Sequence, residues 1–224
     1  MLPLVLPRPT DSPLRVVCFG AHSDDIEIGC GGTVLELIKA YPAIDITWVV
    51  LSGQGDRARE AADSAARFLA GVASHRIILR EFRDGYFPEQ FSTIKDEFES
   101  IRRQVSPDIV FAHYRHDRHQ DHRVVSDLSW NTFRNHLILE YEIPKYDGDL
   151  GQPNLFVPLS SSVCDAKVNH LLAGFPSQSG KPWFDRETFL ALARLRGVEC
   201  HSPSRYAEAF YSRKFLLCPS QGAP

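Results

Sequence analysis

The sequence of 224 residues predicts an α/β fold in which helices cover a mostly parallel sheet. Two observations lead to this prediction. Short runs rich in β-branched residues alternate with segments whose apolar residues recur at helical spacing. These short runs are apolar nearly throughout, as is typical of strands that are buried on both faces. Because parallel strands require crossover connections, the alternation indicates a Rossmann-like three-layer sandwich.

The first half of the expected sheet follows directly from this pattern. Residues 15–20 (RVVCFG) are expected to form the first strand, and residues 28–41 a helix that Pro42 ends. Residues 44–52 (IDITWVVLS) are expected to form the second strand. A helix over residues 59–69 follows, because its apolar side chains lie on one helical face.

The alternation then continues through a third and a fourth strand. Residues 76–82 are expected to be a strand, followed by a turn at Asp84-Gly85. Apolar residues spaced four, three and four apart between positions 94 and 105 predict an amphipathic helix. Residues 109–112 form the fourth strand.

The chain changes character after residue 143, where proline and glycine interrupt short apolar pieces. Two further helices are expected there. One is opened by a capping box of Ser162 and Asp165, and the other covers residues 185–195 and ends at Gly197.

The same change suggests how the chain is organised. Residues 1–14 are expected to be an irregular arm, and residues 15–224 a single domain. Within this domain, residues 15–143 form the Rossmann-like core. Residues 144–224 lack a self-sufficient run of strands, so we expect a small irregular C-terminal lobe that finishes the sheet and walls the site. Whether the segment 144–158 acts as a lid stays open.

The composition excludes several classes of protein. An apolar content of 43% excludes disorder, and a net charge of −3 without a concentrated basic tract argues against nucleic-acid or anionic-membrane partners. No window offers the ~20 apolar residues that a membrane-spanning helix needs. Five scattered cysteines without a C-x-x-C pair favour reduced thiols and a cytoplasmic location. The default partner is therefore a small molecule.

A first group of metal-ligating side chains follows the first strand, in residues 22–25 (HSDD). An imidazole and a carboxylate three positions apart, such as His22 and Asp25, can reach one ion of zinc's size. If Asp25 is a ligand, the adjacent Asp24 points elsewhere and can act as a general base. The alternative is that one of these aspartates only caps the following helix.

A second group follows the fourth strand, in residues 116–122 (HDRHQDH). His119 and His122 again stand three positions apart, and Asp121 between them can orient an imidazole. The alternative is a solvated loop in which nearby arginines pair with Asp117 and Asp121. Because the carboxyl ends of parallel strands meet at one edge of a sheet, the two groups together predict a single metal site.

These residues carry a resemblance to a known family. The stretches AHSDDIE (21–27), GGT (31–33) and HQDH (119–122) resemble the signatures A-H-P-D-D-x-E, G-G-T and H-P-D-H of the LmbE-like, PIG-L-type zinc-dependent N-deacetylases. Ser23 and Gln120 replace the prolines of these signatures. The φ angle is therefore no longer fixed at these two positions, and no ligand is lost.

Two weaker matches extend the resemblance beyond the signatures. Arg57 and Glu60, after the second strand, are similar to the family, and YAEAF (206–210) is a fainter match near the end of the chain.

The resemblance implies a role for each residue of the site. It implies three ligands for Zn²⁺, with another divalent ion such as Fe²⁺ as the alternative: His22, Asp25 and His122. Asp24 would be the general base, and His119 would face the substrate carbonyl. Asp121 is expected to support the orientation and charge of His119. Arg57 would contact the substrate.

We therefore expect a zinc-dependent carbohydrate N-deacetylase. It would remove the acetyl group from an N-acetylated amino sugar of the N-acetylglucosamine type, or from its conjugate, by attack of activated water on the amide carbonyl. One alternative is a metal-dependent hydrolase of another amide or of an ester. Another is a non-catalytic sugar-binding or metal-binding protein, in which Asp24 would have no evident purpose. Relatives are often oligomers, so a homo-oligomer is an open alternative.

Other features have plainer interpretations. Residues 29–33 (GCGGT) lack the last glycine of a dinucleotide-binding loop, and close backbone approach explains them better. His113 and His116 are alternates to His119, expected beside the site or on the surface. Four aromatic residues either stack on a sugar ring or pack in the core: Phe175, Trp183, Phe184 and Tyr206.

Overall fold

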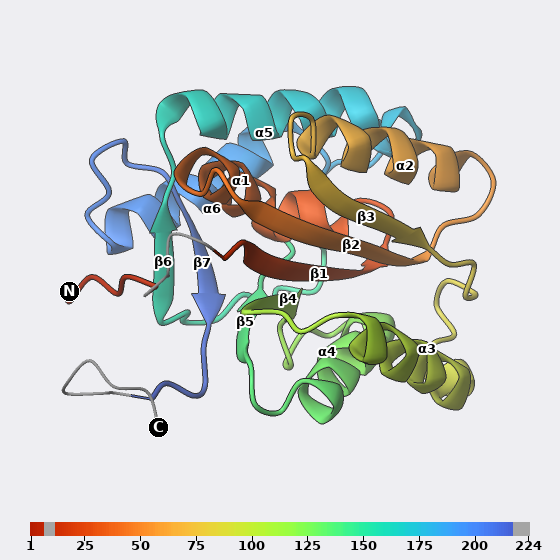
Figure 1. Cartoon of the computed structure of the whole chain (residues 1–224). Coiled ribbons are helices and arrows are strands. Elements are labelled where there is room, and N and C mark those ends of the chain that lie inside the picture. Colours follow the sequence, from red (N-terminus) through yellow and green to blue (C-terminus); the bar gives the residue numbers. More distant parts are fainter. Residues whose placement is uncertain (7–11, 217–224) are drawn as a thin grey trace.

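The structure is a computed structural model that describes residues 1–6 and 12–216. Within this part the chain forms a seven-stranded sheet in the order β3-β2-β1-β4-β5-β7-β6 (Figure 1). The strands are β1 (Leu14–His22), β2 (Ile44–Ser52), β3 (Ser74–Leu79), β4 (Ile109–His113), β5 (Leu137–Tyr141), β6 (Leu155–Pro158) and β7 (Ala207–Tyr211). Strands β1 to β5 are parallel, and β7 is antiparallel to β5 and β6. The predicted α/β fold with a mostly parallel sheet is confirmed.

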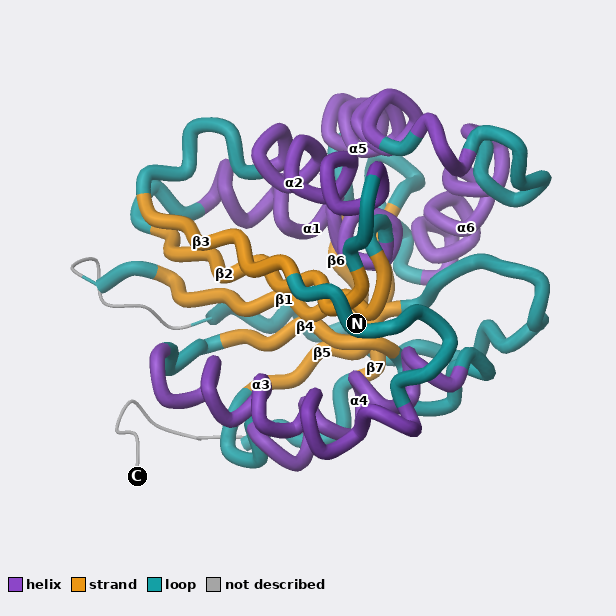
Figure 2. The backbone as a smooth tube through the Cα atoms, turned by 90° about the vertical axis from the view of Figure 1, so that its right-hand side faces the viewer, coloured by secondary structure: helices purple, strands orange, loops and turns teal. Residues whose placement is uncertain are grey.

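Helices cover both faces of this sheet. They are α1 (Asp25–Ala40), α2 (Asp56–Phe68), α3 (Phe91–Gln104), α4 (Gln120–Thr132), α5 (Ser161–Gly174) and α6 (Arg186–Glu199), with short 3-10 turns η1 (Pro88–Gln90) and η2 (Pro176–Gln178). Figures 1 and 2 show α1, α2, α5 and α6 on one face and α3 and α4 on the other. The described part therefore has three layers.

Strand β1 shows why the expected strands are apolar on both sides. Val16 and Cys18 pack into the core beneath α1, α2 and α5, whereas Val17, Phe19 and Ala21 pack into the core beneath α3 and α4. All five side chains are buried. Successive residues of a strand face opposite sides of the sheet, so a strand covered by helices on both faces needs apolar residues at every position.

The predicted boundaries are accurate where apolar residues define an element. The second strand has the expected bounds, Ile44–Ser52. The first two helices begin earlier than expected, at Asp25 and Asp56, because their first turns consist of polar residues that apolar spacing does not reveal. For the same reason helix α4 was not predicted: its buried face, which includes Val124 and Leu128, follows a first turn of polar residues.

The predicted capping box of Ser162 and Asp165 is wrong. Ser160 occupies the N-cap position of α5, and it makes no side-chain cap of its own. Its N–H and its hydroxyl both donate to Glu36 Oε1 at 2.7 Å, so a contact with α1 places the start of this helix. A partner that is distant in sequence therefore replaces the local capping interaction.

Gly197 does not end the last helix, because α6 continues to Glu199. A Cβ atom at Gly197 would lie 2.2 Å from the backbone oxygen of Arg205. This glycine therefore permits α6 to pack closely against the backbone of Arg205, which lies after the helix. The expected start of the helix holds, since Asp185 is the N-cap and accepts the N–H of Thr188 at 2.7 Å.

The C-terminal lobe adds β6 and β7 beyond β5, at the edge of the sheet seen in Figure 1. Residues 1–6 of the expected arm have no helix or strand, and residues 7–11 lie outside the described part. Four cysteines are buried and unpaired, namely Cys18, Cys30, Cys164 and Cys200, while Cys218 lies outside the described residues. Among the described residues, no helix combines the length and apolarity that crossing a bilayer requires.

Candidate metal and active site

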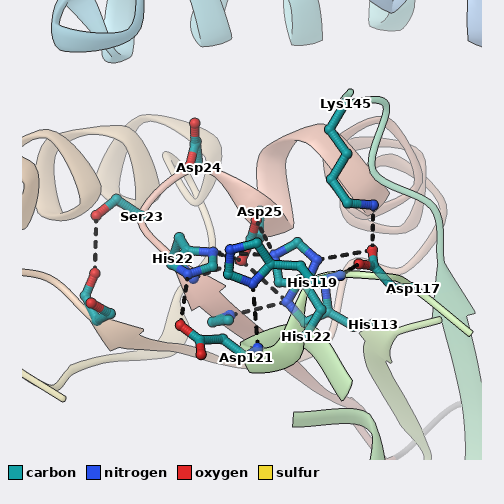
Figure 3. Close-up of polar contacts among 12 residues, drawn as sticks. His22, Ser23, Asp24, Asp25, His113, Asp117, His119, Asp121, His122 and Lys145 are labelled. Carbon is teal, nitrogen blue, oxygen red and sulfur yellow. Dashed lines mark hydrogen bonds and ion pairs between the residues drawn. The ribbon is translucent and has the colours of Figure 1, made fainter. Parts of the chain in front are cut away.

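The two predicted ligand groups meet at one edge of the sheet. Strand β1 ends at His22 and the neighbouring β4 ends at His113, with β2 on the far side of β1 and β5 on the far side of β4. In open α/β sheets, ligands bind at the carboxyl ends of strands where the strand order reverses in this way. Asp25 opens α1 and His119 is the N-cap of α4, so side chains from both crossovers converge there (Figure 3).

Three of the expected ligands have the spacing that a tetrahedral ion requires. His22 Nδ1 lies 3.1 Å from His122 Nε2 and 3.3 Å from Asp25 Oδ2, and His122 Nε2 lies 3.5 Å from Asp25 Oδ1. Zinc bonds of about 2.0–2.1 Å place tetrahedral ligand atoms about 3.3–3.4 Å apart. Asp25 presents Oδ2 to His22 and Oδ1 to His122, so the donor set of two imidazoles and one carboxylate fits zinc in chemistry, and each pair of residues approaches at about that spacing.

The charges around this site favour a cation. Burial raises the pKa of Asp25, but His122, His113 and His22 outweigh burial and hold this pKa well below its ordinary value. Burial likewise lowers the pKa of His22, but Asp25 and Asp121 reverse the effect and raise it well above its ordinary value. The carboxylates that stabilise a proton on His22 would stabilise a metal ion in the same place.

Asp117 holds the two histidines of α4, and the sequence did not single it out. Its Oδ2 lies 2.9 Å from His122 Nδ1, and its Oδ1 accepts the N–H of His119 at 2.8 Å. Lys145 also donates to Oδ2, at 2.9 Å, so the carboxylate pairs with this lysine and an imidazole. The side chain of Arg123 donates to the backbone oxygens of Asp117 and Arg118 and not to the Asp117 carboxylate, which argues against a purely solvated ion-pair loop.

This geometry makes Asp117 the group that orients the His122 ring. Carboxylates behind metal-binding imidazoles typically contribute 10- to 100-fold to metal affinity, so Asp117→Asn is expected to weaken Zn²⁺ binding by about that factor. Competition with a chromophoric chelator would measure the change. The matched control is Asp127→Asn, which alters an exposed aspartate of α4. Equal affinities in the two variants would contradict the assignment.

Asp24 and Asp25 are neighbours with different surroundings. Figure 3 shows the Asp25 carboxylate pointing into the imidazoles and the Asp24 carboxylate pointing away from them. Asp24 occupies the N-cap position of α1 without a side-chain cap, and Asp25 accepts the N–H of His22 at 2.6 Å, so neither supports the capping alternative. Arg57 Nη2 donates to Asp24 Oδ1 at 2.8 Å. The structure thus places the expected substrate-binding arginine on the expected base, and its contact with a substrate stays a prediction.

His119 lies beside the two histidines expected to be ligands, with its ring centroid 4.8 Å from that of His22 and 4.7 Å from that of His122. Its Nδ1 accepts the backbone N–H of Asp121 at 3.3 Å, as the N-cap of α4. An imidazole that accepts at Nδ1 carries its proton on Nε2, so Nε2 is the atom that can donate to a substrate oxygen. Burial, followed by the charges of His122 and His22, lowers the pKa of His119, which keeps the ring neutral.

The carboxylate of Asp121 lies on His22 rather than on His119. It is 3.2 Å from His22 Nε2 and accepts the N–H groups of Gly85 at 2.6 Å and Phe87 at 3.1 Å. Sequence spacing suggested support of His119, but that contact comes from the backbone N–H of Asp121 because side chains in the first turn of a helix diverge. Its carboxylate instead orients a ligand from the other strand.

Two further side chains of the site are His113, which the sequence left undecided, and Asp84, which was expected only as part of a turn. His113 is fully buried, its ring stacks on His122 at 3.9 Å, and its Nε2 lies 3.1 Å from Asp25 Oδ2. Burial, together with His122, lowers the pKa of His113 to about 4, so this imidazole is neutral. Asp84 is largely exposed, and its Oδ1 lies 3.1 Å from His22 Nε2. His116, the other histidine that the sequence left undecided, is exposed.

These side chains form three overlapping groups within the described residues, each able to hold a metal ion. The groups are His22, His119 and His122; Asp25, His113 and His122; and His22, Asp84 and Asp121. His22 and His122 each belong to two groups, which makes them the centre of the cluster.

The glycine-rich stretch of α1 supports the site through packing. A Cβ atom at Gly29 would lie 2.1 Å from the ring of Tyr141, which confirms close backbone approach as its explanation. Glu208 of β7 accepts the N–H groups of Gly32 at 2.8 Å and Thr33 at 2.6 Å. The stretch 206–210 therefore contacts the GGT stretch directly.

Of the four aromatic residues left open between sugar stacking and packing, two belong to the core. Phe175 is fully buried and Phe184 is nearly so. Trp183 and Tyr206 are half-buried, and the ammonium group of Lys181 lies 5.4 Å from the centroid of a Trp183 ring.

The family model for GlcNAc-PI de-N-acetylases, PIG-L, matches residues 17–133, which include both ligand groups. The chain belongs to the PIG-L family. The resemblance drawn from the motifs is therefore confirmed, and membership of this family supports an enzyme that acts on N-acetyl groups.

One relative and two solved structures extend this comparison. The chain is similar to the uncharacterized deacetylase YaiS of Escherichia coli strain K12, with 32% identity over 142 residues, covering 58% of this chain and 74% of YaiS. It shares its fold with the N,N'-diacetylchitobiose deacetylase of Pyrococcus horikoshii, at a TM-score of 0.69 and 20% identity over 89% of this chain and 83% of that one. It also shares its fold with GalB, the 4-carboxy-2-hydroxymuconate hydratase of Pseudomonas putida KT2440 (TM-score 0.67, 16% identity, 93% of this chain and 100% of that one). At these identities the two structures show the fold alone.

Proposed function

We propose that this PIG-L protein is a zinc-dependent N-deacetylase that releases acetate from an N-acetylated amino sugar or its conjugate. One observation carries the proposal: His22 Nδ1 and His122 Nε2 lie 3.1 Å apart, and the two carboxylate oxygens of Asp25 lie 3.3 Å and 3.5 Å from them, at about the spacing of ligands around a tetrahedral ion. Three protein ligands leave a fourth position for water or substrate, as in catalytic zinc sites.

The metal ion would act as a Lewis acid on a water molecule and on the amide carbonyl. Asp24 would accept the proton of the attacking water, while Arg57 holds the carboxylate through the contact at 2.8 Å. The Nε2–H of His119 would donate a hydrogen bond to the carbonyl oxygen as negative charge develops on it, and His119 would keep its proton. Asp24 would then pass its proton to the amine nitrogen, so that the C–N bond breaks and acetate and a free amine leave.

The substrate class is supported by the family rather than by a bound ligand. The family model describes de-N-acetylation of an N-acetylglucosaminyl lipid, and a structural relative is named for a chitin disaccharide. Trp183 and Tyr206 are half-buried and stay candidates to stack on a sugar ring.

Acetate release tests this proposal. The zinc-loaded protein would be assayed on N-acetylglucosamine, N,N'-diacetylchitobiose and N-acetylglucosaminyl conjugates, beside a panel of other amides and esters. We expect acetate and free amine in equal amounts from the amino sugars, with loss of activity on chelation and recovery on adding Zn²⁺. Turnover confined to other amides or esters would favour the broader metal-dependent hydrolase. Zinc binding without any turnover would favour a non-catalytic binding protein.

A further inference from the structure

A chain of polar contacts links the C-terminal lobe to Asp24. Ser177, in turn η2, donates its N–H to Glu60 Oε1 at 2.8 Å and its hydroxyl to Glu60 Oε2 at 2.6 Å. Glu60 Oε2 also accepts from Arg57 Nη1 at 3.3 Å, and Arg57 Nη2 donates to Asp24 at 2.8 Å. Ser177 therefore reaches Asp24 through Glu60 and Arg57.

The lobe also holds the guanidinium group of Arg57 directly. Its central carbon lies 5.6 Å from the centroid of the Phe175 ring, and Nη1 lies 3.4 Å from Ser177 Oγ. Phe175 is fully buried, so its ring is a fixed surface. An arginine side chain has many rotamers, and contacts on both its face and its edge select one of them.

The position of Arg57 matters because Asp24 depends on it. Asp24 is only 4% exposed, and a buried carboxylate needs a charged partner. Proton transfer requires the acceptor oxygen within hydrogen-bond reach of the attacking water, and small displacements lower the rate steeply. A group that fixes Arg57 therefore fixes the geometry of the base.

We propose that Ser177 is a positioning residue, which holds Glu60 so that Arg57 keeps Asp24 in the orientation that proton transfer requires. This inference rests on the proposed function, in which Asp24 is the base. Ser177 lies outside residues 17–133, where the family model matches, so the C-terminal lobe would complete a site whose reacting groups all come from the core.

The test is a set of serine variants assayed on the substrate identified by acetate release. For Ser177→Ala we expect kcat to fall about tenfold, as loss of one hydrogen bond from a positioning network does, with KM changed by less than about twofold. Ser177→Thr keeps the hydroxyl and should restore most of kcat. Ser179→Ala is the matched control, because Ser179 lies in the same exposed turn and donates only to the backbone oxygen of Pro176. Zinc content and melting temperature should match those of the unchanged protein in all three variants.

Several results would overturn this inference. Unchanged kcat in Ser177→Ala, equal losses in Ser177→Ala and Ser179→Ala, or a crystal structure of Ser177→Ala with Arg57 still in place on Asp24 would each do so. Asp24→Asn in the same assay separates this inference from the proposed function. If Asp24→Asn is inactive while Ser177→Ala is fully active, only the positioning role fails; if Asp24→Asn is fully active, the proposed base fails as well.

Discussion

Asp24→Asn is expected to lower kcat by a factor of about 10²–10⁴, the usual contribution of a positioned general base, while the protein keeps its metal ion. Asparagine has the size of aspartate and can accept from Arg57, but it cannot take a proton from water at neutral pH. The side chain of Asp24 makes no capping hydrogen bond, so the substitution removes no helix cap. Steady-state kinetics together with metal analysis would measure both parts of this result.

The matched control for Asp24→Asn is Asp63→Asn, which makes the same chemical change at an exposed position of α2. It should leave kcat and metal content unchanged. If Asp24→Asn retains full kcat, another group must take the proton. If Asp24→Asn instead loses the metal ion, the role of Asp24 is to hold the metal ligands in place and not to accept the proton of water.

His122→Ala is expected to abolish both metal binding and activity. In the proposed site His122 would supply one of three ligand atoms from a side chain that is only 3% exposed, and the substitution leaves the carboxylates of Asp25 and Asp117 without their shared imidazole. Loss of an orienting carboxylate alone costs about 10- to 100-fold in affinity, so loss of a ligand should cost more than about 100-fold. Metal analysis after dialysis and titration calorimetry with Zn²⁺ would measure it.

Stability gives an independent measurement of the same event. A ligand at 100 times its dissociation constant stabilises a protein by about 2.7 kcal/mol, so Zn²⁺ should raise the melting temperature of the unchanged protein and not that of His122→Ala. The control is His116→Ala, which removes an exposed histidine from the same segment. Zinc bound to His122→Ala with unchanged affinity would remove this residue from the ligand set.

Local sequence patterns predicted the elements that have an apolar face. The bounds of β2 follow from a run rich in β-branched residues, and the alternating sides of β1 follow from burial beneath two layers of helices. Helix α4 was missed because its first turn carries ligand and orienting side chains in place of apolar ones. Gly197 was wrongly predicted to end the helix. A glycine is needed there because the backbone of Arg205, on another segment, lies too close for a side chain.

The candidate site divides in a similar way. The motifs and their resemblance to the PIG-L family singled out His22, Asp25 and His122. The structure places the two imidazoles 3.1 Å apart and a carboxylate oxygen of Asp25 within 3.5 Å of each. Spacing did not reveal which carboxylate orients which imidazole. Asp117 lies behind His122 and Asp121 behind His22, although Asp121 is the closer of the two to His122 in sequence.

By itself, the sequence determined the α/β alternation and the chemical types of the ligands, because strand runs, helical spacing and motif residues are properties of neighbouring positions. Only the tertiary structure decided which of these side chains share a centre. His22 and His122 are 100 residues apart, and they meet because β1 and β4 pair in parallel and end at the same edge of the sheet. The contact of Ser177 with Glu60 across 117 residues has the same origin, since the packing of α5 against α2, and not any local pattern, brings that turn to the site.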